Sequence, residues 1–244
     1  THDDVEVTLA LSGGWMGNRI RRRFSRWDEN DVLTEIQHDN DQRHYQEYIP
    51  SIGINWTINE NSSLRLNLEA QEWEWRREQI SIIDQPVCGV FEPLRIEHAQ
   101  SEDDHGGSRL GSMSYSNALS NGFSLETMAL IRREEWFNGP ETYASFDPVA
   151  GFTGSVIVRN SGEYEESALR QTLSFDPNEN HSVEFGGEIA VNARDTSIEL
   201  FSDDGVTVTP IVLPVANTRV EETRSEIFAN HVWTINDALS LEGG

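Results

Sequence analysis

Apolar and polar residues alternate with a period of two along most of this 244-residue chain. The apolar residues of 52–58 are separated by Gly, Asn and Thr, and those of 64–70 by Arg, Asn and Glu. Similar alternation occupies 5–11, 123–132 and 183–194, and a weaker form occupies 167–175 and 225–235. Because successive side chains of a strand point to opposite faces, this pattern predicts long antiparallel β-strands with one apolar and one polar face.

A repeat organises these predicted strands. The tetrapeptide Trp-Thr-Ile-Asn occurs at 56–59 and again at 233–236, each time before a short polar turn. The first apolar residues after four such turns are separated by 59, 60 and 56 residues, and they are Leu64, Phe123, Val183 and Leu239. A period of this kind indicates repeated supersecondary units. We therefore expect eight strands and the start of a ninth, arranged as hairpins.

The connections at the other ends of the hairpins differ in composition. Polar segments that hold most of the prolines and many of the acidic residues lie near 25–44, 83–108, 137–162 and 200–218. We interpret them as long loops that alternate with the short turns. Membrane β-barrels have short periplasmic turns and long external loops, so this asymmetry favours a membrane barrel.

The distribution of aromatic residues points in the same direction. One group lies beside the short turns, namely Trp56, Phe123, Phe175 and Trp233. A second group lies at the opposite strand ends, namely Trp73, Trp75, Trp136 and Phe137. Two such groups are typical of the interfacial aromatic girdles of membrane proteins. The predicted fold class is therefore all-β: an antiparallel meander of long hairpins forming part of a transmembrane β-barrel. We expect one partial barrel domain over 1–244, cut at both ends.

Charge and composition exclude several other classes. The formal net charge is −24, so phosphate repulsion argues against a nucleic-acid partner. No run of about 18 apolar residues is present, which excludes a membrane-spanning helix, and the first residues lack the pattern of a signal peptide. The single cysteine, Cys88, cannot form an intrachain disulfide here; an incidental loop residue is the favoured interpretation, and a reactive thiol or a cysteine with its partner outside this fragment are the alternatives.

Two stretches resemble barrel strands of TonB-dependent outer-membrane receptors. They are Leu173–Glu188, which reads Leu-Ser-Phe-Asp-Pro-Asn-Glu-Asn-His-Ser-Val-Glu-Phe-Gly-Gly-Glu, and Arg219–Gly244, which includes Trp-Thr-Ile-Asn-Asp-Ala-Leu-Ser-Leu. The resemblance implies a barrel of about twenty-two strands around a plug domain, located in the bacterial outer membrane. It also implies uptake of a siderophore, cobalamin or an oligosaccharide. The expected partners are outer-membrane lipid, lipopolysaccharide and a small-molecule nutrient. The plug domain and TonB would be reached through parts of the full-length protein that this sequence lacks.

The densest basic cluster is the main candidate ligand site. It comprises Arg19, Arg21, Arg22, Arg23 and Arg26. These arginines could contact lipopolysaccharide phosphates or an anionic ligand at the external mouth. The favoured interpretation is a solvated strand end that pairs with nearby Asp28, Glu29 and Asp31.

Other charged residues offer weaker candidates. Seven on the polar parity could line a substrate path, although interstrand ion pairs or contacts with a plug are favoured: Arg65, Glu69, Glu126, Arg132, Glu184, Glu188 and Arg194. Four residues of one predicted loop suggest a weak metal site, but an acidic loop is the favoured interpretation: His98, Asp103, Asp104 and His105. The neighbouring acids Glu134 and Glu135, or Asp203 and Asp204, need no acid–base role. No G-x-S-x-G motif frames a nucleophile. We expect no enzyme, no cofactor, no metal and no catalytic residue.

Two alternatives remain. One is a complete small outer-membrane barrel with a structural or adhesive role. The other is a soluble secreted β-sandwich, for example a carbohydrate-binding protein, whose apolar face would pack against a second sheet. The membrane interpretation predicts that six residues share one uncovered face: Ile52, Ile54, Leu66, Leu68, Phe185 and Ile189.

Overall fold

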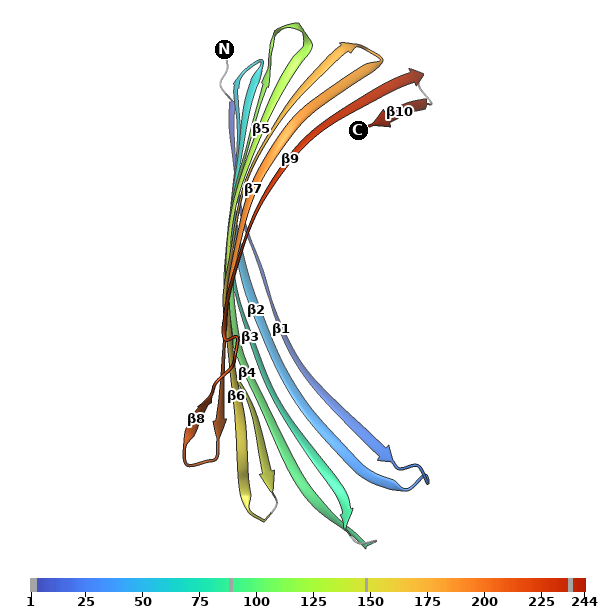
Figure 1. The fold of residues 1–244 in the computed structure, drawn as a ribbon, viewed down its shortest axis with the longest axis vertical. Helices are drawn as coiled ribbons and strands as arrows, with labels where there is room; N and C mark the ends of the chain where they lie inside the picture. The colour runs from blue at the N-terminus through green and yellow to red at the C-terminus, as the bar shows by residue number, and fades with distance from the viewer. Residues whose placement is uncertain (1–3, 88–89, 148, 237–238) are drawn as a thin grey trace.

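The computed structural model describes residues 4–87, 90–147, 149–236 and 239–244. These form one twisted and curved antiparallel sheet (Figure 1). Its strands are β1 (Asp4–Trp27), β2 (Leu33–Asn59), β3 (Ser62–Val87), β4 (Val90–Ala118), β5 (Phe123–Asp147), β6 (Gly151–Asn178), β7 (His181–Asp203), β8 (Val208–Ile211), β9 (Asn217–Asn236) and β10 (Leu239–Gly243), with one short 3-10 turn, η1 (Ser120–Gly122).

The topology is a meander. Each strand pairs with the next in the order β1-β2-β3-β4-β5-β6-β7-β9-β10, and the short β8 pairs with β7. The predicted fold class is confirmed, with the long strands β1–β7 and β9 as the eight strands and β10 as the start of the ninth. The sheet is open, because β1 and β10 lie at opposite ends of the strand order. No helix in the described part of the chain is long and apolar enough to cross a membrane.

Three of the four predicted long loops are wrong. The segments near 25–44, 83–108 and 137–162 are largely strand, so the hairpins continue to short connections such as 28–32 between β1 and β2. In that connection the Asp28 Oδ1 atom accepts hydrogen bonds from the backbone N–H groups of Asn30 and Val32, at 2.8 and 2.9 Å. The hydropathy alternation disappears in these segments because both faces carry polar side chains, whereas the backbone ladder continues. In the fourth segment, near 200–218, a long connection over 204–216 does join β7 to β9, and it contains the short β8.

Strand register assigns the predicted apolar residues to one face. Ile52 lies opposite Leu68 and Ile54 opposite Leu66, so all four point to the same side. The strand pairing through β4, β5 and β6 places Phe185 and Ile189 on this same side of the sheet. We call this side the apolar face and the other the polar face.

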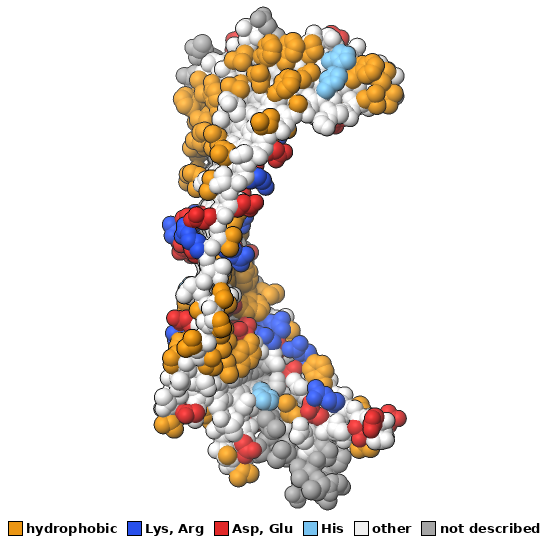
Figure 2. All heavy atoms as spheres, in the orientation of Figure 1, with side chains coloured by type: hydrophobic (Ala, Val, Ile, Leu, Met, Phe, Trp, Pro, Cys, Tyr) orange, Lys and Arg blue, Asp and Glu red, His pale blue; other side chains and the backbone are white. Residues whose placement is uncertain are grey.

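The apolar face has no second layer over it within the described ranges, because every strand belongs to one sheet. Leu68 is 55% exposed and Phe185 is 54% exposed. Among the described apolar residues, only Ala190 is buried. Figure 2 shows hydrophobic side chains gathered over the end of the sheet that holds the short turns, with charged side chains further along. The expected single uncovered face is confirmed.

The apolar band has a definite height. In β7 it extends from Val183 to Ala193, and at about 3.3 Å per residue this covers roughly 33 Å along the strand. A strand tilted by about 40° would then span about 25 Å, the height of the apolar band of an outer-membrane barrel. Beyond the band, this face carries ion pairs such as Arg109–Glu72 and Arg133–Glu163.

One of the two predicted aromatic girdles needs correction. Trp56, Phe123, Phe175 and Trp233 lie on the apolar face near the short turns, and the Phe123 and Phe175 rings stack at 4.2 Å. At the opposite end, Trp73, Trp75 and Trp136 lie on the polar face, while Phe137 lies on the apolar face. The reason is strand parity, since the odd residues of β3 face away from Leu64, Leu66 and Leu68.

Candidate functional site

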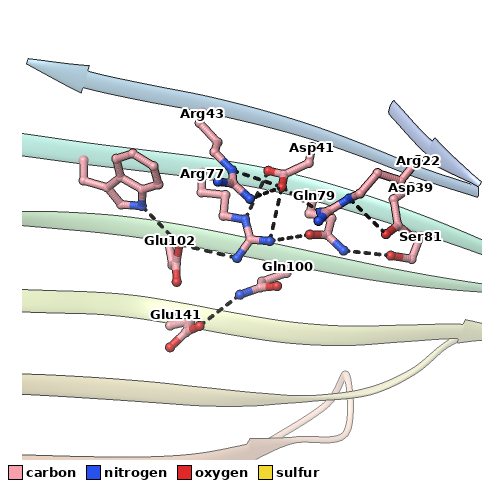
Figure 3. Close-up of polar contacts among 11 residues, drawn as sticks. Arg22, Asp39, Asp41, Arg43, Arg77, Gln79, Ser81, Gln100, Glu102 and Glu141 are labelled. Carbon is pink, nitrogen blue, oxygen red and sulfur yellow. Dashed lines mark hydrogen bonds and ion pairs between the residues drawn. The ribbon is translucent and has the colours of Figure 1, made fainter. Parts of the chain in front are cut away.

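Figure 3 shows a network of charged and amide side chains, which strand register places on the polar face beyond the level of the apolar band. We call it the Asp41 network. It draws on β1 to β5 and comprises Arg22, Asp39, Asp41, Arg43, Arg77, Gln79, Ser81, Gln100, Glu102 and Glu141. Register positions these residues, because Asp41 lies opposite Ile20 in β1 and Gln79 in β3. Arg22 in β1, Arg43 in β2 and Arg77 in β3 each lie two residues along their strand from this level, and their side chains reach Asp41.

Asp41 is the centre of the network. Its side chain has no exposed surface, and its carboxylate accepts hydrogen bonds from three guanidinium groups. The Nη2 atoms of Arg22 and Arg43 lie 3.0 and 2.7 Å from Oδ2, and the Nε atom of Arg77 lies 3.1 Å from Oδ1. Burial alone raises the pKa of Asp41, but the hydrogen bonds from Arg43 and Arg77 outweigh it and lower the pKa below its usual value.

Each guanidinium group of the network lies close to a carboxylate. Asp39 lies 3.7 Å from the Nε atom of Arg22, and Glu102 lies 3.9 Å from the Nη1 atom of Arg77. Asp39, Asp41 and Glu102 therefore match the three guanidinium groups, and Glu141 is a fourth carboxylate of the network, which accepts a hydrogen bond from Gln100. Burial also raises the pKa of Glu102. This arrangement braces neighbouring strands and leaves Arg22, Arg43 and Arg77 already engaged.

The network ends in a carboxylate–phenol pair. The Nε2 atom of Gln100 donates to Glu141 Oε1 at 3.0 Å, and the Tyr143 hydroxyl donates to the same oxygen. The hydrogen bond to Glu141, followed by burial, raises the pKa of Tyr143 to about 12. Tyr143 is therefore a neutral hydrogen-bond donor at neutral pH.

An aromatic stripe lies beside the network on the same face. It comprises Tyr45, Trp73, Trp75 and Trp136. Trp75 donates from Nε1 to Glu102 at 3.2 Å, and its ring centroid lies 6.4 Å from that of Tyr45. The stripe and the ion pairs together give this part of the polar face flat apolar rings among hydrogen-bonding groups.

The predicted arginine cluster is divided by strand alternation. Arg19, Arg21 and Arg23 point to the apolar face, and Arg22 and Arg26 to the polar face. The predicted partners Asp28, Glu29 and Asp31 are wrong. Arg22 instead pairs with Asp39 and Asp41, Arg26 pairs with Glu35 at 3.4 Å, and the Nε atom of Arg19 donates to Asn40. Binding of a ligand by these arginines stays a prediction.

The seven charged residues expected on the polar parity all lie on the polar face: Arg65, Glu69, Glu126, Arg132, Glu184, Glu188 and Arg194. Glu188 forms interstrand ion pairs with Arg224 at 2.9 Å and Arg170 at 3.9 Å. For Glu188 the favoured interpretation is thus confirmed. A role of this set in a substrate path stays a prediction.

The expected loop with four metal-binding residue types is a strand. His98 and Asp104 lie on the polar face of β4, whereas Asp103 and His105 lie on the apolar face. Among the residues with described side chains, no group of three His, Cys, Asp or Glu could hold a metal ion. Cys88 lies outside the described residues.

Sequence reasoning missed the Asp41 network, although a signal was present. Asp39, Asp41 and Arg43 alternate in β2, and Arg77 and Gln79 alternate in β3, so each set lies on one face of its strand. The sequence does not contain the register that brings the two sets together.

No family model and no curated protein sequence matches this chain. Among solved structures, the ferric yersiniabactin uptake receptor FyuA of Yersinia pestis is similar, with 7% sequence identity and a TM-score of 0.38. The match covers 93% of this chain and 40% of the receptor chain. A likeness of this degree does not define a family for the chain.

Proposed function

We propose that this chain is a barrel-wall segment of a TonB-dependent receptor in the bacterial outer membrane, acting in uptake of a small nutrient and not as an enzyme. The observation that carries the proposal is the apolar band, which is exposed on one face of a single sheet whose other face is charged. Contiguous exposed apolar surfaces of this kind are rare on soluble monomers and mark contact with lipid or protein.

The height of the band and the charge beyond it support contact with lipid. Hydrocarbon covers an apolar band of about 25 Å in outer-membrane barrels, and polar residues line their interior. Arg19, Arg21 and Arg23 lie on the apolar face past the end of the band. In the proposed membrane they contact phosphates of lipopolysaccharide. A plug domain and TonB act through other parts of the protein.

The open sheet favours a wall segment over the two alternatives. A complete small barrel pairs its first strand with its last, whereas β1 and β10 end the strand order here. A soluble sandwich packs its apolar face against a second sheet, and the band over Leu68 has no such cover in the described ranges.

The orientation is tested with two neighbouring arginine substitutions. Leu68 lies within the band, and Asn67 lies on the polar face at the same level, opposite Gly53 and Ser112. In the protein expressed from its intact gene and folded into lipid vesicles, Leu68→Arg should lower the free energy of unfolding by about 2–4 kcal/mol. Asn67→Arg should lower it by less than about 1 kcal/mol, because a residue facing the bore stays hydrated.

Denaturant titration from the vesicles gives both values. Equal losses for the two variants would contradict the assignment of the faces. The receptor role is tested separately by nutrient uptake in cells with and without TonB, and uptake that persists without TonB would contradict it.

A further inference from the structure

Two tryptophans of the aromatic stripe lie over glycines of the next strand. A Cβ atom added to Gly106 would lie 2.6 Å from Cζ2 of Trp73, and one added to Gly162 would lie 2.2 Å from Cζ2 of Trp136. Each indole therefore occupies the space that a side chain would fill. Both tryptophans are half-buried, so part of each ring stays accessible on the polar face.

The two indoles form a row across the strands. Trp73 lies opposite Gly106, Gly106 opposite Trp136, and Trp136 opposite Gly162. Because neighbouring strands are about 4.8 Å apart, the two tryptophans are separated by roughly 10 Å. This distance suits the stacking of two sugar rings of one extended oligosaccharide, whose C–H faces pack on the rings.

Hydrogen-bonding groups flank the row. Glu47 accepts hydrogen bonds from the Tyr45 hydroxyl at 2.8 Å and from Gln71 Nε2 at 3.0 Å. The guanidinium carbon of Arg194 lies over the Trp136 ring, 5.3 Å from its centroid, which places N–H donors at that ring. Sugar hydroxyls both donate and accept, so carboxylate and guanidinium groups both bind them.

The charged groups near the row do not favour an anionic ligand. The arginines nearest the row in the Asp41 network, Arg43 and Arg77, are already held by Asp41. The row itself carries the carboxylate of Glu47 beside Trp73 and the guanidinium of Arg194 over Trp136, which are opposite in sign. A ferric chelate with several negative charges would therefore find no net positive charge to attract it here, whereas a neutral polyhydroxylated chain needs none.

We propose that the polar face binds a neutral oligosaccharide, with Trp73 and Trp136 as two stacking platforms on one row. This inference rests on the proposed function in one respect: it takes the polar face as the lining of the uptake path. It narrows the nutrient to the oligosaccharide class.

The test uses the protein expressed from its intact gene and purified from outer membranes in detergent. Calorimetric titration compares cellohexaose, xylohexaose and maltohexaose with ferric enterobactin as the anionic probe. At least one hexasaccharide should bind, and Trp73→Ala and Trp136→Ala should each weaken that binding by about tenfold or more. Binding of ferric enterobactin should be undetectable.

A glycine pair provides a matched control. The three atoms nearest a Cβ at Gly162 all belong to the Trp136 ring, so Gly162→Ala displaces the indole without removing it. The corresponding atoms at Gly186 all belong to the Phe228 ring, which lies on the same face nearer the short turns. Gly162→Ala should weaken sugar binding as much as Trp136→Ala, whereas Gly186→Ala should leave it unchanged. Circular dichroism checks the fold of each variant, and if Gly162→Ala does not fold, Trp136→Ala and Trp136→Tyr carry the comparison.

The outcomes separate this inference from the proposed function. If no hexasaccharide binds, or if Gly162→Ala and Gly186→Ala bind it equally, the platforms are structural and the inference fails. A protein in the outer membrane that takes up only the ferric probe overturns the sugar assignment and leaves the transport role. Sugar binding by a protein that fractionates as soluble supports the platforms and rejects the membrane role.

Discussion

Asp41 is held by arginines from three strands, and this makes one carboxylate important for the alignment of all three. Its partners Arg22 and Arg77 lie 19 and 36 residues away in sequence. Removal of an enclosed carboxylate of this kind is strongly destabilising, because the guanidinium groups that it paired with then repel one another without compensation. The polar face therefore gains register specificity at this point.

Asp41→Asn should lower the free energy of unfolding by about 3 kcal/mol in a denaturant titration. Asp39→Asn is the matched control and should have a smaller effect, since Asp39 makes one ion pair, at 3.7 Å.

The pH dependence provides a second measurement. Because the pKa of Asp41 is lowered in the folded protein, its contribution is fully present above the unfolded pKa of about 3.9 and is lost as pH falls through the folded pKa. Wild type should lose this increment on acidification below about pH 4, and Asp41→Asn should not. Identical acid profiles for the two proteins would contradict the assignment.

At the scale of strands, the sequence predicts the half of each hairpin that carries the apolar band well and the other half poorly. In 64–70 one face is apolar, so the period of two is visible. In 72–79 the apolar face carries Glu72 and Glu74 while the polar face carries Arg77, so both faces are charged and the period disappears. Strand parity alone would have placed Trp73 on the polar face. The prediction instead assigned it to an aromatic girdle because it lay near the expected end of its strand.

The candidate site could be predicted only in part. The charges on the polar face follow from parity alone, which places Glu188 correctly. The Asp41 network depends on pairing between β1, β2 and β3, and the indole platforms depend on Gly106 and Gly162 lying opposite tryptophans. Such long-range register is set by the whole sheet and is not written in a local pattern.

The acidic tips of the hairpins are closed by side chains. Asp204 accepts hydrogen bonds from the backbone N–H groups of Val206 and Thr207, at 2.9 and 2.8 Å, and those bonds lower its pKa. Asp204→Ala should accelerate amide hydrogen exchange at Val206 and Thr207, because the acceptor is lost. Exchange rates in β5, measured by the same method, should not change. Unaltered exchange at the two turn amides would show that the backbone holds the turn without this carboxylate.

At the scale of the molecule, the sheet has two unpaired edges and an uncovered apolar face. Open edges and exposed apolar surface both favour association of chains. The chain with the present bounds should therefore form assemblies in water and become smaller in detergent. Analytical ultracentrifugation measures this difference. A monodisperse, cooperatively folded monomer without detergent would be incompatible with the proposed lipid contact.

The strands also continue well past the apolar band before they turn. In β2 the hydrogen-bonded ladder persists from Thr57 to Ile36, so the part above the band is a rigid rim, not a fringe of mobile segments. The chain therefore loses little conformational entropy when a ligand binds there. A ligand that binds at such a rim would meet a preorganised surface, so binding would be fast and its specificity would be set by shape.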